Sequence, residues 1–70
     1  MTASITITVN GDARPFERDR SLDDLLRTLE LDPRMVVVEH NRSIVRRPEL
    51  GAVRLQDGDS VELVHFVGGG

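Results

Sequence analysis

One stripe of leucines limits the possible folds of this chain more than any other feature of its sequence. Its members follow the spacing i, i+3, i+4 and i+7, which is one apolar face of a helix: Leu22, Leu25, Leu26 and Leu29. Ser21 precedes the stripe as an N-cap residue. Asp32 stands before Pro33 and therefore avoids helical backbone, so we expect one main helix near residues 21–31. The rest of the chain must cover the apolar face of this helix.

The first part of the chain has the pattern of two strands joined by a tight turn. Residues 4–9 alternate polar and β-branched apolar side chains, which predicts a half-buried strand with Ile5, Ile7 and Val9 toward the core. The dipeptide Asn10-Gly11 predicts a hairpin turn, because both residues tolerate positive φ. The return strand over residues 13–17 includes Pro15, which suits an edge, and Phe16, which we expect in the core.

The second half contains three further strand patterns. Residues 35–38 are an unbroken apolar run, which predicts a strand buried on both faces. Residues 43–45 can return antiparallel to it, and a short helical turn is expected at residues 46–49. A turn at residues 56–59 precedes the last strand, residues 60–67.

This order of elements predicts an α+β fold, the ubiquitin-like β-grasp, in which a small mixed sheet packs on one main helix. The first and last strands should lie side by side and parallel in the centre of the sheet, with the helix in the crossover between them. We expect residues 1–67 to form this domain and residues 68–70 to form a flexible tail of three glycines.

Composition excludes several classes of function. With 70 residues the chain is one domain, and without cysteine it has neither disulfides nor thiolate metal ligands. A net charge of −3 has the wrong sign for a nucleic-acid binder, and no apolar run is long enough to span a membrane. The first residues lead straight into a strand without a secretory signal, so the expected compartment is the cytoplasm.

Conventional catalytic and metal-binding motifs are not found in the sequence. The neighbouring carboxylates fit structural roles, Asp23 and Asp24 at the start of the helix and Asp57 and Asp59 in a turn. Two histidines, which we expect on the surface, are too few for a structural zinc site. We therefore expect no enzyme site, no bound cofactor and no metal on the chain itself.

The three last residues, Gly68, Gly69 and Gly70, follow directly on an apolar strand. A tail without side chains can pass through a narrow channel and present its α-carboxylate to a buried site. That carboxylate is ionised and can attack the α-phosphate of a nucleotide, after which a sulfur nucleophile can displace AMP. The alternative is a frayed end without function.

Apolar residues stand on both sides of the last strand near its end. Val64, Phe66 and Val67 are more than a domain of this size can bury, so we expect them to form a docking surface for a partner protein. The alternative for Phe66 is an ordinary core position.

The sequence resembles the ThiS family, the sulfur carrier proteins of thiamine thiazole biosynthesis. The similarity extends over nearly the whole chain and rests on these segments: Val9-Asn10-Gly11, Ser21-Leu22, Leu25-Leu26, Asn41, Ile44-Val45, Arg47, Asp57-Gly58-Asp59, Val61-Glu62 and Phe66-Val67-Gly68-Gly69-Gly70. No segment is specific alone, since a terminal Gly-Gly also marks molybdopterin-synthase small subunits and ubiquitin-like modifiers.

The resemblance implies a protein co-substrate and not an enzyme. An adenylyltransferase of the ubiquitin-activating-enzyme type would use ATP to charge Gly70 as an acyl adenylate. A persulfide donor would convert it to a thiocarboxylate, which would deliver sulfur to thiazole synthase. The alternatives are a sulfur carrier for molybdopterin or cysteine synthesis, a ubiquitin-like protein modifier, and a plain interaction module.

Overall fold

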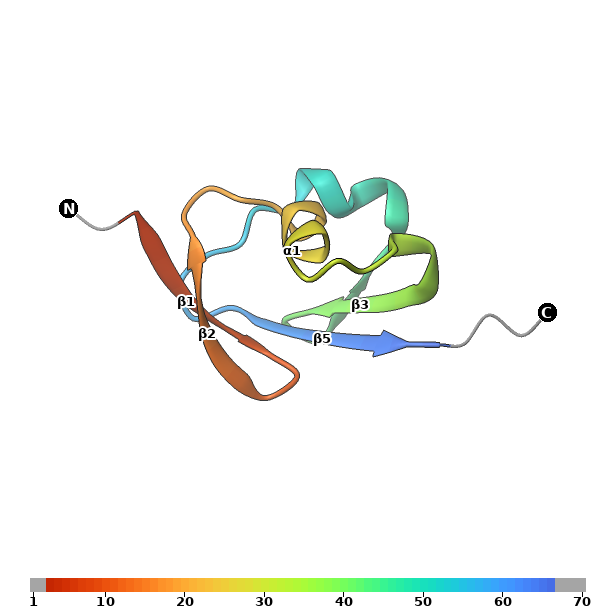
Figure 1. Ribbon diagram of the computed structural model, residues 1–70, viewed down its shortest axis with the longest axis horizontal. Helices are drawn as coiled ribbons and strands as arrows, with labels where there is room; N and C mark the ends of the chain where they lie inside the picture. Colours follow the sequence, from red (N-terminus) through yellow and green to blue (C-terminus); the bar gives the residue numbers. More distant parts are fainter. Residues whose placement is uncertain (1–2, 67–70) are drawn as a thin grey trace.

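A computed structural model describes residues 3–66 of the chain (Figure 1). Along the chain the elements are β1 (Ser4–Val9), β2 (Asp12–Glu17), α1 (Leu22–Thr28), η1 (Pro33–Met35), β3 (Val36–His40), β4 (Ser43–Val45), η2 (Arg47–Ala52) and β5 (Ser60–His65), where η denotes a 3₁₀ helix. No helix within residues 3–66 is long and apolar enough to cross a membrane.

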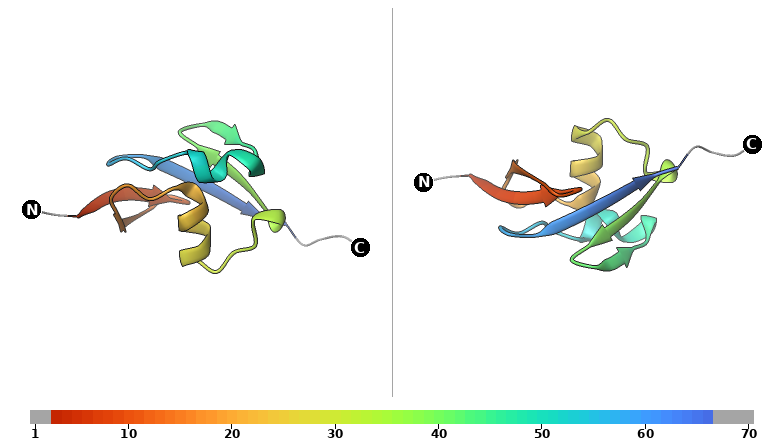
Figure 2. Two further views of the ribbon diagram at one scale, coloured as in Figure 1. Left: turned by 90° about the horizontal axis from the view of Figure 1, so that it is seen from above. Right: turned by 90° about the horizontal axis from the view of Figure 1, so that it is seen from below.

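The strands form one sheet in the order β2-β1-β5-β3-β4. β1 and β5 pair in parallel, and the other neighbours are antiparallel. Both α1 and η2 lie over the same face of the sheet, so among the described residues the opposite face has no covering helix (Figure 2). The predicted β-grasp architecture is confirmed, including the parallel central pair.

The core lies between this covered face and the two helical segments. It contains aliphatic side chains from every layer together with one aromatic ring: Ile5, Ile7, Phe16, Leu22, Leu25, Leu26, Val36, Val38, Leu50, Leu55 and Val61. Phe16 is buried, as expected from the sequence. Leu50 and Leu55, in and after η2, are core residues that the sequence patterns did not reveal.

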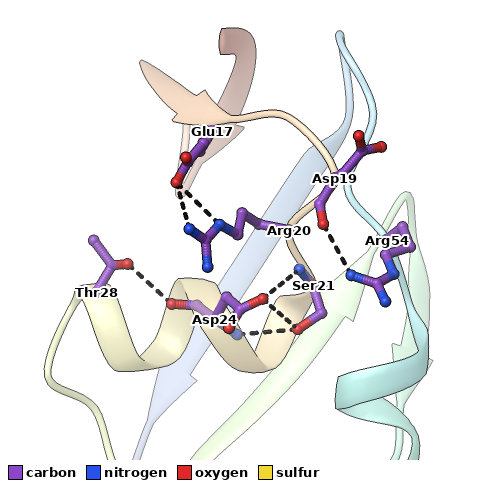
Figure 3. A network of polar contacts seen from close by, with 7 residues as sticks. All are labelled: Glu17, Asp19, Arg20, Ser21, Asp24, Thr28 and Arg54. Atoms are coloured by element: carbon purple, nitrogen blue, oxygen red, sulfur yellow. Dashed lines mark hydrogen bonds and ion pairs between the residues drawn. The ribbon is translucent and has the colours of Figure 1, made fainter. Parts of the chain in front are cut away.

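The start of α1 is held by a capping box, shown with its neighbours in Figure 3. The Asp24 N–H donates to Ser21 Oγ at 3.1 Å, and the Ser21 N–H donates to Asp24 Oδ2 at 3.0 Å. The second of these bonds, more than any other contact, lowers the pKa of Asp24 below its ordinary value. Two backbone N–H groups that have no acceptor within the helix are thereby hydrogen-bonded, which confirms Ser21 as the N-cap.

The helix is shorter than residues 21–31, because it ends at Thr28. Glu30 has a left-handed backbone with φ 58°, and its N–H donates to the Arg27 carbonyl at 3.0 Å. The Leu31 N–H donates to the Leu26 carbonyl at 2.9 Å. These two bonds form a Schellman motif, which ends a helix usually at glycine or asparagine. Since glutamate occupies the left-handed position here, the sequence pattern placed the helix end too late.

Strand β3 is buried on one face and not on both. Val36 and Val38 are buried, but Val37 between them is 41% exposed. Helices cover one face of the described sheet, so alternate residues of a central strand remain open to solvent despite the unbroken apolar run. The prediction of two-sided burial for residues 35–38 is therefore wrong at Val37.

Candidate functional site at the end of the last strand

The two halves of β5 have different neighbours. At its start β5 lies between β1 and β3, with Val61 opposite Val9 on one side and His40 on the other. The last backbone bond to the β1 side runs from the Asn10 N–H to the Val61 carbonyl at 2.9 Å. β5 then runs past the end of β1 and keeps β3 as its strand partner (Figure 2).

Pairing with β3 extends one residue beyond the strand itself. The Phe66 N–H donates to the Met35 carbonyl at 3.0 Å, which continues the antiparallel ladder after His65. The backbone is thus held up to Phe66, the last residue that the structure describes. Val67, Gly68, Gly69 and Gly70 lie outside the described residues.

Two of the three predicted docking residues lie on the uncovered face and are exposed. Val64 is 61% exposed and Phe66 is 43% exposed, so Phe66 is not a core residue. Val37 pairs directly with Val64 in the register of β3 and β5 and shares this face. We call Val37, Val64 and Phe66 the open-face patch. Ile44, 67% exposed, lies on the same face of the edge strand β4, because it pairs with Glu39, two residues from Val37.

Acidic side chains border the open-face patch. Glu39 pairs directly with Glu62 in the next row of the β3–β5 ladder. Like charges opposite one another on neighbouring strands destabilise a sheet. A partner surface that combines apolar side chains with a cation would therefore complement this end of the sheet.

A polar network holds the start of β5. Asp59 Oδ2 accepts from the Gln56 N–H at 2.9 Å and lies 2.7 Å from His40 Nε2, and Asn41 Nδ2 donates to Asp59 Oδ1 at 3.2 Å. Burial alone would raise the pKa of Asp59, but these hydrogen bonds and the nearby His40 lower it below its ordinary value. Asp57 accepts from the Thr6 N–H at 2.8 Å and so attaches the predicted turn at residues 56–59 to β1, whereas Asp59 bonds within that turn.

The structure corrects the predicted surface position of one histidine. His40, expected on the surface, has a side chain only 20% exposed because it packs against Asp59. His65 is exposed, as expected. Within residues 3–66 no three side chains of His, Asp or Glu gather where they could hold a metal ion.

A groove of about 520 Å³ lies beside the second half of β5. Leu63 and His65 of β5, Asn10 of the hairpin turn, and Leu29 and Leu31 after α1 contribute to its lining. The side of β5 that β1 leaves is therefore bordered by this groove.

Comparisons with known proteins agree on one family. The model of the ThiS family matches residues 7–70. The chain is 37% identical to the sulfur carrier protein ThiS of Bacillus subtilis, over 91% of this chain and 98% of that protein. A solved structure of the thiamine biosynthesis protein ThiS from Geobacter metallireducens superposes with a TM-score of 0.81 at 32% identity, covering 94% of this chain and all of that one.

Two longer proteins also match. The chain is 44% identical to a thiazole synthase of Magnetococcus marinus and 39% identical to one of Paramagnetospirillum magneticum, over 64 residues in each case. The match covers 91% of this chain but spans only a fifth of the length of these relatives. A stretch similar to the whole β-grasp domain is therefore contained in both thiazole synthases.

Proposed function

Because the chain belongs to the ThiS family, we propose that it is a protein co-substrate whose working group is the α-carboxylate of Gly70. Its role as a sulfur carrier in thiamine biosynthesis follows from the family together with the fold. The chemical steps, the partners and a cytoplasmic location are our proposal.

In the first step a carboxylate oxygen of Gly70 attacks the α-phosphorus of ATP, and pyrophosphate leaves. The resulting acyl adenylate is open to attack by the terminal sulfur of a persulfide donor, which displaces AMP. A thiol then cleaves the sulfur–sulfur bond and leaves a thiocarboxylate on Gly70. Catalytic side chains for these steps belong to the adenylyltransferase, and Gly68 and Gly69 pass through its channel because they have no side chains to obstruct it.

The observation that carries the proposal is the open-face patch. Val37, Val64 and Phe66 leave apolar surface exposed at the end of the strand that leads to the glycines. Exposed apolar patches with polar borders mark protein–protein contacts. An adenylyltransferase that covers this patch and places a cation opposite Glu39 and Glu62 would hold the last strand while the glycines enter its active site.

Thiazole synthase is the proposed acceptor of the sulfur. The two thiazole synthases that contain a stretch similar to this chain support a functional link between carrier and synthase. Physical linkage of two modules raises their effective concentration for each other. Molybdopterin synthesis, cysteine synthesis and protein tagging are the alternatives to this pathway, and no feature of residues 3–66 favours them over it.

The test is the intact mass of the chain after incubation with ATP, a persulfide donor and the cognate adenylyltransferase. We expect one oxygen to be exchanged for sulfur, located on Gly70 by fragmentation. A residue added after Gly70 should abolish the exchange, since a displacement of about 1 Å at a reacting centre can lower a rate on the order of 100-fold. Gly69→Val should also fail, because a branched side chain obstructs the channel.

Gly51→Val is the matched control, because a Cβ at this glycine meets no atom within 4 Å and its backbone has no positive φ. This variant should acquire sulfur as fast as the parent chain. Sulfur on a chain extended after Gly70 and protected from trimming would refute the carrier mechanism. Conjugates to lysines of other proteins would instead identify a protein modifier.

A further inference from the structure

Asn10 bonds the second half of β5 through its side chain. The Leu63 N–H donates to Asn10 Oδ1 at 2.7 Å, and Asn10 Nδ2 donates to the Leu63 carbonyl at 3.2 Å. Both backbone groups of Leu63 on this side are thereby satisfied by one amide, as they would be by a neighbouring strand. The side chain of Asn10 therefore extends the β1 side of the ladder past the point where β1 itself has turned away.

The backbone of Asn10 allows this contact. Asn10 has φ 51° and Gly11 has φ 87°, so both turn residues are left-handed, which asparagine and glycine tolerate better than other residues. The turn thus has two functions, reversing the chain into β2 and placing an amide beside β5. Leu63 is three residues before Phe66, where the described backbone ends.

We propose that Asn10 is a positioning residue for the C-terminal glycines. Beyond Val61, β5 has one strand neighbour, β3, and the Asn10 amide supplies the two bonds on the other side at Leu63. A segment bonded on both sides leaves the sheet in one direction, whereas a segment bonded on one side can twist and fray. This inference rests on the proposed function, in which the glycines must reach an active site in a defined orientation.

The chain contains a matched control in Asn41. It is also left-handed, with φ 49°, and its Oδ1 accepts from the Ser60 N–H at 2.9 Å. The side chain of Asn41 therefore also bonds the backbone of β5, but at the start of the strand and through one bond, since its Nδ2 donates to Asp59. Substitution by glycine permits positive φ at either position and removes only the side-chain bonds.

The experiment compares Asn10→Gly and Asn41→Gly with the parent chain. Amide hydrogen exchange measured by NMR should show loss of protection at Leu63 in Asn10→Gly only. In thiocarboxylate formation Asn10→Gly should lower kcat by about tenfold or more, because misplacement of a reacting group costs rate. Its Kd for the adenylyltransferase should stay within about twofold, because the open-face patch is unchanged. Asn41→Gly should leave kcat unchanged.

Two results would overturn the inference: an unchanged kcat in Asn10→Gly, or an equal loss of kcat in Asn41→Gly, which would indicate general destabilisation. A parent chain that acquires no sulfur would instead contradict the proposed function, so the two failures are distinguishable. Asn10→Asp keeps the acceptor for Leu63 but sets a carboxylate against its carbonyl. If the amide is the positioning group, this variant should not restore the kcat of the parent.

Discussion

The two ends of β5 differ in almost every physical respect. At its start, Val61 is fully buried, both neighbouring strands are present, and the polar network of Asp59, His40 and Asn41 holds the preceding turn. At its end, one strand neighbour remains and the side chains on the uncovered face are apolar and exposed. The residues that stabilise the fold and those of the proposed docking surface therefore lie at opposite ends of a single strand.

This separation explains how so small a domain can expose apolar surface. A chain of 70 residues buries only about 60% of the area that its unfolded form exposes, so its core has little to spare. Hydrogen bonds at the start of β5 fix the strand without using apolar side chains of the open face. Those side chains are then available to a partner.

The largest expected effect is on stability at the start of the strand. Val61→Ala should lower the free energy of unfolding by about 2.5 kcal/mol, because it removes two buried carbons and leaves a cavity. Val64→Ala, the same substitution three residues later, should change it by less than about 0.5 kcal/mol, since this side chain is 61% exposed. Urea titration of both variants measures the difference. Equal losses would contradict the separation.

The next effect is on partner binding at the end of the strand. Phe66→Ala should weaken binding to the adenylyltransferase by about 2 kcal/mol, or about 30-fold in Kd, because buried interface aromatics contribute most to affinity. Calorimetric titration measures the change. Arg27→Ala, on the helix that covers the opposite face, is the control and should bind like the parent. Unfolding of Phe66→Ala, or unchanged affinity of a folded variant, would show that Phe66 does not belong to the docking surface.

The smallest effect concerns charge at the start of the strand. The lowered pKa of Asp59 means that its ionised form stabilises the fold. This contribution is complete above the unfolded pKa of about 4 and is lost as the pH falls through the lower folded value. Asp59→Asn should therefore cost about 1 kcal/mol at neutral pH and less at pH 3.

The pH series needs the parent chain as its reference. Asp24 and Asp32 also have lowered pKa values, so both proteins lose stability in acid, and only the difference between them reports Asp59. Thermal unfolding followed by circular dichroism from pH 7 to about pH 3 measures it. A difference that is constant over this range would show that the charge of Asp59 contributes nothing.

Local patterns predicted the fold well wherever local chemistry decides it. The alternation in β1, the Asn10-Gly11 turn, the N-cap at Ser21 and the turn at residues 56–59 all follow from the properties of at most six consecutive residues, and each is found in the structure. The parallel pairing of β1 and β5 followed from topological rules and is also confirmed.

Two of the errors arise where segments distant in the sequence determine which side chains are buried, and one arises from an unusual local backbone. Val37 looked buried because a run of apolar residues does not reveal that one face of the sheet has no cover. The end of α1 depends on a left-handed glutamate, which sequence preferences disfavour. His40 is covered by Asp59, nineteen positions away, and no local pattern contains that contact.

The candidate site was likewise predicted from the sequence only in part. Exposure of Val64 and Phe66 could be anticipated from an excess of apolar residues, whereas their neighbour Val37 was missed together with the error in β3. The bonds from Asn10 to Leu63 join residues 53 apart in the sequence. Asparagine before glycine indicated a turn, and that interpretation left no reason to expect a second role for its amide.

The position of β5 in the sheet also has a consequence for the protein during its synthesis. The hairpins β1–β2 and β3–β4 are made first by the ribosome, but in the sheet order they are joined through β5, which follows them in the chain. A nascent chain that does not yet include β5 therefore lacks the central strand of the sheet. It also lacks Val64 and Phe66, so the open-face patch is incomplete. A chain that stops before β5 therefore lacks both the strand that joins the two hairpins and the exposed side chains of the proposed docking surface, so we expect it neither to fold nor to compete for the partner.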